Sequence, residues 1–193
     1  MRTAEFDRHE VLEAAMEVFC RKGYANTTMQ DLKIATGLHP GSLYCAFTNK
    51  RGILLAALQQ FIENRWQQSQ QCFQHENALE GIRSYLKRLV TNLLEKNSYC
   101  LLSRTIAEFS HIDDEISQML MVPWQQLSDR LAQELKRAAA QGHLKSDLSI
   151  QDTTQMLFVM VMGLRSFPCI LVDEQVLNAS VDSLIELIRA PRG

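Results

Sequence analysis

The sequence contains few residues that break helices, with eight glycines and four prolines among 193 residues. Most of its segments instead repeat apolar residues at intervals of three and four, which is the spacing of one helix face. Hydrophobic residues make up 46% of the chain, enough to build a core. We therefore predict an all-α fold of about nine helices.

Long apolar runs are also absent. The longest, residues 156–164, stops at Arg165 and is far shorter than the roughly 20 residues that a bilayer requires. The opening residues MRTAEFDRHE include no apolar stretch of the signal-peptide type. These features predict a cytoplasmic protein with no membrane contact.

The five cysteines and five histidines form no CxxC pair, no HxxxH pair and no His-Cys cluster. A zinc site or a disulfide framework is therefore not expected, and we predict no metal and no cofactor. No local motif supplies a nucleophile, a base and an orienting group, so we expect no catalytic residues and no enzyme. A small helical enzyme with a Cys or His nucleophile and a helical adaptor that binds only protein remain alternatives.

The net charge of −2 is divided unevenly along the chain. Residues 1–51 contain seven Lys or Arg and six Asp or Glu, whereas the remainder contains 13 basic and 16 acidic residues. A protein that binds DNA needs cations on one face rather than a high total. The residues predicted to form such a face are Lys33, His39, Lys50 and Arg51.

Two short helices joined by a tight turn are predicted within residues 27–55. Thr28 and Asp31 have the spacing of a capping box, so a helix begins there. Gly37 is suited to ending it, and Pro40 is favoured at the first position of the next helix. This order of elements is typical of a helix-turn-helix DNA-binding motif.

Other helix starts are predicted where a short polar side chain precedes an apolar-periodic segment. Together with Thr28, these residues are Asp7, Asn49, Asn77, Ser149 and Asp173. A further helix is expected near residues 100–109.

The second short helix, residues 40–47, carries small polar groups at its N-terminus, where side chains and free N–H groups can meet bases and phosphates. We predict that bases are read by His39, Gly41 and Ser42, with Cys45 one turn later. Phosphate contacts are predicted for Thr28, Tyr44 and Lys50. Two alternatives are that this helix only connects core helices and that the Tyr44 ring lies in the core.

The motif resembles the N-terminal domain of the TetR family of transcriptional regulators over residues 11–50. The resemblance rests on Val11, Leu12, Ala15, Phe19, Gly23-Tyr24, Thr27-Thr28, Gly37, Ser42, Leu43, Tyr44, Phe47 and Lys50. It implies the following DNA-binding residues: Thr28, Lys33, His39, Pro40, Gly41, Ser42, Leu43, Tyr44, Cys45 and Lys50.

The same resemblance implies a DNA-binding domain over residues 1–50 and a ligand-binding and dimerisation domain over residues 51–193. It also implies a homodimer formed through the last two major helices. The segment MLFVMVMGLRSF, residues 156–167, is apolar almost all round, so such a helix must be covered on more than one side. The alternative is a core helix buried within one subunit.

In the fold that this resemblance implies, the elements that surround a ligand pocket carry aromatic rings and thioethers here, so the effector is predicted to be a small apolar or aromatic molecule. The predicted ligand-binding residues are Trp66, Tyr99, Cys100, Arg104, Trp124, Met156 and Met160. These residues can also be plain core, and Arg104 can either orient a polar group or pair with Glu108 one turn away.

Cys100 supports a second hypothesis. At a helix start the thiol pKa can be lowered, and some TetR-type regulators that sense oxidants or electrophiles carry Gly-Cys-Leu in a comparable place. Here Tyr99 replaces the glycine. The sequence thus favours a ligand-responsive repressor that binds a pseudo-palindromic duplex DNA operator as a dimer, with a thiol-based sensor as the alternative. A single helix beginning at Asn49 would act as the lever between effector and DNA.

Overall fold

The computed structural model describes residues 6–94, 101–109, 113–166 and 173–191. The chain forms two compact units. Unit 1 comprises Met1–Arg65 and Tyr99–Leu120, and unit 2 comprises Trp66–Ser98 and Met121–Gly193. Each unit therefore combines segments that are distant in sequence.

The described residues form nine α-helices and no strand beyond an isolated bridge between Leu144 and Arg189, which confirms the predicted all-α fold. The helices are α1 (Arg8–Lys22), α2 (Met29–Thr36), α3 (Pro40–Phe47), α4 (Lys50–Cys72), α5 (Ala78–Leu94), α6 (Leu101–Phe109), α7 (Asp114–Ala140), α8 (Ile150–Ser166) and α9 (Glu174–Ile188). Within these ranges, no helix is both long and apolar enough to cross a membrane.

The predicted helix starts are confirmed by the hydrogen bonds of their capping side chains. In each case a side-chain oxygen accepts a backbone N–H from the first turn, which satisfies a donor without an intrahelical partner. The residues that do so are Asp7, Thr28, Asn49, Asn77, Ser149 and Asp173. The ninth helix then ends at Ile188, three residues before Pro191.

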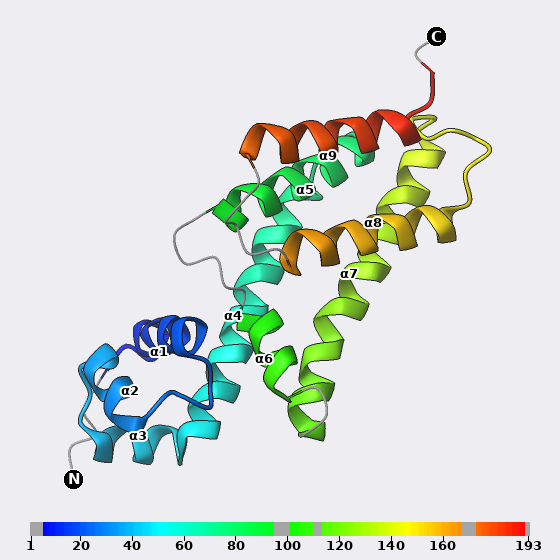
Figure 1. Cartoon of the computed structure of the whole chain (residues 1–193). Coiled ribbons are helices and arrows are strands. Elements are labelled where there is room, and N and C mark those ends of the chain that lie inside the picture. The colour runs from blue at the N-terminus through cyan, green and yellow to red at the C-terminus, as the bar shows by residue number, and fades with distance from the viewer. Residues whose placement is uncertain (1–5, 95–100, 110–112, 167–172, 192–193) are drawn as a thin grey trace. The chain divides into compact units, whose positions relative to one another are not determined.

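In unit 1, helix α1 packs against α2 and α6, and α2 packs against α3 (Figure 1). Phe19 of α1, Leu32 of α2 and Leu43 of α3 are almost completely buried. Burial of these apolar side chains holds the three short helices together, because helices of eight residues are not stable alone.

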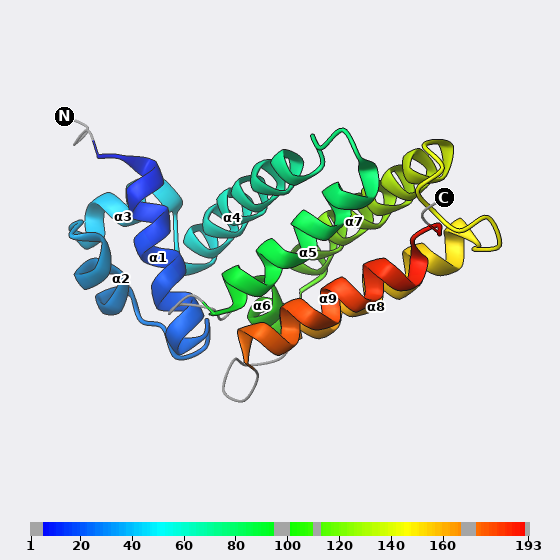
Figure 2. The ribbon, with the colours of Figure 1, turned by 90° about the horizontal axis from the view of Figure 1, so that it is seen from above.

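In unit 2, helix α5 packs against both α8 and α9 (Figure 2). Its apolar side supplies Ile82 and Leu86 to the core, and the Tyr85 ring lies 5.1 Å from that of Phe73. Ion pairs join α5 and α9 at the edge of this core, where Arg83 and Lys87 both bind Asp182. Unit 2 is therefore built around α5.

Two helices contribute residues to both units. The boundary between the units falls after Arg65 in α4 and after Leu120 in α7. Packing thus groups the first 16 residues of α4, and all of α6, with the helix-turn-helix segment. The functional division after residue 50 stays a prediction.

Candidate nucleic-acid interface

The N-terminus of α2 forms the predicted capping box. The Thr28 hydroxyl oxygen accepts a hydrogen bond from Asp31 N at 3.1 Å, and Asp31 Oδ2 accepts one from Thr28 N at 2.9 Å. Lys22 Nζ lies 2.6 Å from Asp31 Oδ1. The Lys22 and Thr28 hydrogen bonds hold the pKa of Asp31 well below its usual range.

This network bears on the phosphate contact predicted for Thr28, which stays a prediction. Its hydroxyl has one proton, and that proton is donated to Asp31 Oδ2 at 2.8 Å. A hydrogen bond from this hydroxyl to a phosphate would have to replace the bond to Asp31. In the structure, the Thr28 side chain therefore starts the helix rather than offering a free donor to DNA.

The turn between α2 and α3 also forms as predicted. Gly37 adopts the left-handed conformation with φ 69° and ψ 0°, and its N–H donates to Lys33 O at 3.0 Å. Pro40 is the first residue of α3, and His39 Nδ1 accepts a hydrogen bond from Gly41 N at 3.2 Å. The His39 side chain thus caps α3, which leaves its Nε2 as the nitrogen available to another group.

Helix α3 has a buried side and an exposed side. Leu43 and Phe47 are buried, whereas Gly41 and Cys45 are exposed and Tyr44 is 48% exposed. The alternative that the Tyr44 ring lies in the core is therefore wrong. The DNA-binding role predicted for Leu43 is also wrong for its side chain, which is fully enclosed by unit 1.

The connection from α3 to α4 is a single tight turn at Thr48. Thr48 has φ 68° and ψ −49°, and Asn49 N donates to Phe47 O at 2.7 Å. These values describe a γ-turn with positive φ, which is strained for a β-branched residue. Nothing in the sequence except the short spacing between α3 and α4 indicated this turn.

Lys50 and Arg51 are both engaged within unit 1. Lys50 Nζ donates to two backbone carbonyls, Tyr24 O and Thr27 O, each at 2.8 Å. Arg51 binds Asp113 through two hydrogen bonds of 2.9 Å and Glu115 through one of 2.7 Å, and these bonds raise the pKa of its guanidinium.

The predicted cationic face is consequently smaller than expected. Arg51 is neutralised by two carboxylates, and Lys50 directs its hydrogen bonds into the protein. Lys33 is half-buried and forms no ion pair with a described residue. It remains the candidate cation of α2.

The similarities to known proteins agree with this geometry. A model of bacterial regulatory proteins of the tetR family matches residues 11–57. YezE, an HTH-type transcriptional regulator of Bacillus subtilis (strain 168), is 30% identical over 149 residues, which are 76% of this chain and 77% of YezE. The chain belongs to the TetR family.

Two further TetR-type proteins extend the comparison. The HTH-type transcriptional repressor ComR of Escherichia coli (strain K12) is 26% identical over 167 residues, covering 84% of this chain and 80% of ComR. A solved structure of a cysteine-substituted CifR with 26-bp double-strand operator DNA has a TM-score of 0.83 and 21% identity, covering 97% and 100% of the two chains. The protein is thus a DNA-binding transcriptional regulator with the TetR fold.

The ligand-binding residues predicted for this TetR-family chain are not all brought together. Tyr99 and Cys100 lie outside the described residues. In unit 2, Trp124 is buried and meets the Phe158 ring edge-on, with 6.0 Å between the ring centroids. Trp66 and Met160 are half-buried.

Met156 and Trp124 were both predicted to bind the effector, and this role of Met156 stays a prediction. Met156 and Phe158 are two residues apart on α8, so they point about 200° apart around the helix axis. Phe158 contacts Trp124, whereas Met156 is exposed with Val159. Met156 therefore lies on the outer side of α8.

Arg104 is also placed differently from the prediction. Its guanidinium donates to Cys20 O in α1 at 2.9 Å, and its Nε lies 3.5 Å from Glu108 Oε1. The alternative that Arg104 pairs with Glu108 is confirmed. The pair lies against α1 rather than on an open surface.

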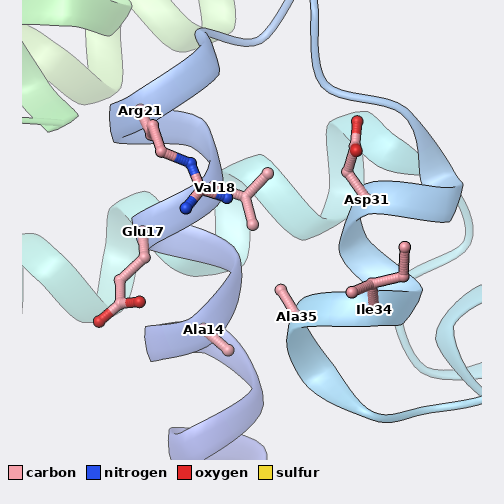
Figure 3. Close-up of a pocket in the computed structure, with 7 residues that line it drawn as sticks. All are labelled: Ala14, Glu17, Val18, Arg21, Asp31, Ile34 and Ala35. Atoms are coloured by element: carbon pink, nitrogen blue, oxygen red, sulfur yellow. The ribbon is translucent and has the colours of Figure 1, made fainter.

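An open groove of about 270 Å³ lies between α1 and α2 (Figure 3). It is lined by Ala14, Glu17, Val18, Arg21, Asp31, Ile34 and Ala35. Ile34 is 71% exposed at its edge. None of the residues predicted for DNA or effector binding lines this groove. Among the described residues, no group of three or more His, Cys, Asp or Glu has the arrangement of a metal site.

Proposed function

We propose that this protein is a ligand-responsive repressor that binds a pseudo-palindromic operator as a homodimer. The observation that carries the proposal is the division of α3 into a buried side, with Leu43 and Phe47, and an exposed side, with Gly41, Tyr44 and Cys45. A recognition helix needs this division, because one side must pack on the domain while the other enters the major groove.

The proposed readout uses the exposed side of α3. His39 offers Nε2, the half-buried Ser42 offers a hydroxyl, and Gly41 has no side chain to keep the backbone from the bases. Cys45 lies one turn further along the same side. The exposed Tyr44 hydroxyl is the proposed phosphate contact.

The proposed homodimer uses uncharged stripes on α8 and α9. Residues 156, 159 and 163 of α8 are Met, Val and Gly, and all are exposed. Residues 176, 180, 183 and 187 of α9 are Val, Ser, Ser and Leu, with the leucine 61% exposed. Stripes of apolar and small residues without charge support close packing of helices from two subunits.

The proposed effector is a small apolar or aromatic molecule that contacts unit 2 near Trp124 and Phe158. Helix α4 supports a lever between this site and DNA, since its 23 residues form one helix about 34 Å long that contributes to both units. Effector binding would then lower the affinity for the operator, and operator binding would lower the affinity for the effector by the same factor. We also propose a cytoplasmic regulator without catalytic activity.

Selection of bound sequences from random duplex DNA tests the proposal. We expect enrichment of two inverted half-sites whose centres lie one helical turn of DNA, or a multiple of it, apart. In Ser42→Ala, preference should relax at one or two base positions of each half-site, whereas Ser84→Ala, an exposed serine of α5, should select the wild-type motif. Failure of the wild-type protein to enrich any motif would overturn the proposal.

The effector can be sought through the fluorescence of Trp66 and Trp124, which are the two tryptophans of the chain. Compounds that quench this emission should also weaken operator binding. Quenching without any change in operator affinity would overturn the lever. Release of DNA only on thiol oxidation, abolished in Cys100→Ser, would favour the thiol-based sensor instead.

A further inference from the structure

The turn between α1 and α2 is bound by two side chains of α6. After Gly23, the next two backbone N–H groups point toward one carboxylate. Tyr24 N donates to Glu108 Oε1 at 3.2 Å, and Ala25 N donates to Glu108 Oε2 at 3.1 Å. Both oxygens of Glu108 are thus used by residues more than 80 positions earlier in the chain.

Arg104 binds the other side of the same turn. It lies one helical turn before Glu108 on α6 and donates to Cys20 O, near the C-terminus of α1, at 2.9 Å. Carbonyls in the last turn of a helix lack intrahelical donors and carry partial negative charge. The Arg104 guanidinium therefore matches the partial negative charge of the carbonyl, and the Glu108 carboxylate matches the partial positive charge of the N–H groups.

Gly23 makes this approach possible. It is buried, with φ 77° and ψ 164°, a combination that is accessible almost only to glycine. A Cβ at this position would also overlap Glu108 Oε1. The rings of Tyr24 and Phe109 add an edge-on contact with centroids 5.0 Å apart.

We infer that Arg104 and Glu108 are positioning residues for DNA binding, which act by fixing the Gly23–Thr28 turn and with it the N-terminus of α2. The turn leads directly into the Thr28 cap, and α2 packs against α3. Neither side chain needs to touch DNA. Helix α6 thereby contributes to DNA binding through the position of α2. This inference rests on the operator binding proposed above.

The test compares two substitutions that each remove one negative charge. Glu108→Gln keeps the length of the side chain but turns an amide NH₂ group toward a backbone donor. Glu76→Gln is the control, since the Glu76 side chain is exposed and forms no hydrogen bond or ion pair with a described residue. Operator affinity is measured by fluorescence anisotropy as a function of salt.

We expect Glu108→Gln to weaken operator binding by about two- to thirtyfold. The control should bind equally well or more tightly, because loss of a negative charge alone favours DNA. The slope of affinity against salt should be unchanged in Glu108→Gln, since no phosphate contact is removed. Faster hydrogen exchange at the Tyr24 and Ala25 amides would accompany the weaker binding.

A structural role alone would lower the melting temperature of Glu108→Gln without changing operator affinity in the folded protein, and that result would overturn the inference. If Glu108→Gln does not fold, Arg104→Lys replaces it in the same comparison. Unchanged operator affinity of Arg104→Lys would then be decisive against the inference. If the wild-type protein binds no duplex, the proposed function fails before this test begins.

Discussion

Lys50 contacts Tyr24 in two ways, because its Nζ lies 2.8 Å from the Tyr24 carbonyl oxygen and 4.2 Å from the centroid of the Tyr24 ring. A third contact, to Thr27 O, is 2.8 Å long. An ammonium group has three N–H donors, and two of them are used by these carbonyl oxygens while the charge lies over the Tyr24 ring. Lys50 therefore joins α4 to the turn that precedes α2.

This arrangement predicts different salt dependences for two lysines. Lys50→Met keeps an apolar stem of similar length but loses the hydrogen bonds, so operator affinity should fall while the slope of log K against log salt stays constant. Lys33→Ala should lower the slope by about one, as expected for one lost phosphate contact. A slope that falls by about one in Lys50→Met would instead restore its predicted phosphate contact.

The helix boundaries were predictable because their causes are local. A capping side chain and the backbone N–H from which it accepts a hydrogen bond are two or three residues apart. Asn77 and Ser149 therefore predict the starts of their helices from a few neighbouring residues. The buried side of α3 followed from the spacing of Leu43 and Phe47 for the same reason.

The partners of the charged side chains were not predictable, because they depend on contacts across long stretches of chain. The local sequence around a lysine beside a recognition helix does not show whether its ammonium group binds a phosphate or protein carbonyls. Lys50 binds carbonyls 23 and 26 residues away. Arg51 was assigned to the DNA face, yet its carboxylates follow 62 and 64 residues later. The carboxylates of Arg51 come from the start of α7, whereas the carbonyls of Lys50 come from the turn between α1 and α2, and only the packing of unit 1 brings these groups together.

The strained turn at Thr48 predicts a stabilising substitution. Thr48→Gly removes the cost of positive φ for a β-branched residue, although glycine loses more backbone entropy on folding. We expect a net stabilisation of about 1 kcal/mol, or a rise of about 2–4 °C in melting temperature.

The matched control is Thr91→Gly, at an exposed position within α5, where the same substitution should be destabilising by roughly 0.3 to 0.5 kcal/mol. Both variants can be compared by thermal unfolding. Equal destabilisation by the two substitutions would show that Thr48 is not strained.

The Asp31 network predicts a specific pH dependence of stability. The pKa of Asp31 is lowered in the folded protein, so its contribution to stability is complete above its unfolded pKa, near 3.8. The contribution is lost as the pH falls from about 5 toward the lower folded value, because the unfolded chain then binds more protons.

Thermal unfolding of the wild type and Asp31→Asn isolates this contribution from those of other carboxylates. The variant should melt at a lower temperature at pH 7, because it loses the ion pair with Lys22. The two melting temperatures should converge as the pH is lowered below about 4. A difference that stays constant with pH would mean that the charge of Asp31 does not stabilise the fold.

The uncharged stripe of α9 predicts how the proposed dimer can be broken. In an isologous interface each substitution occurs twice, so Leu187→Arg places two unpaired cations in one apolar contact. We expect the dissociation constant of the dimer to rise by at least about a hundredfold, since an unpaired buried charge costs about 3 kcal/mol or more.

Gln133→Arg adds the same charge on an exposed position of α7 and should leave the dimer intact. Sedimentation at micromolar protein distinguishes the two, and operator affinity should fall only in the variant that dissociates. A dimeric Leu187→Arg protein would place the interface elsewhere on the molecule.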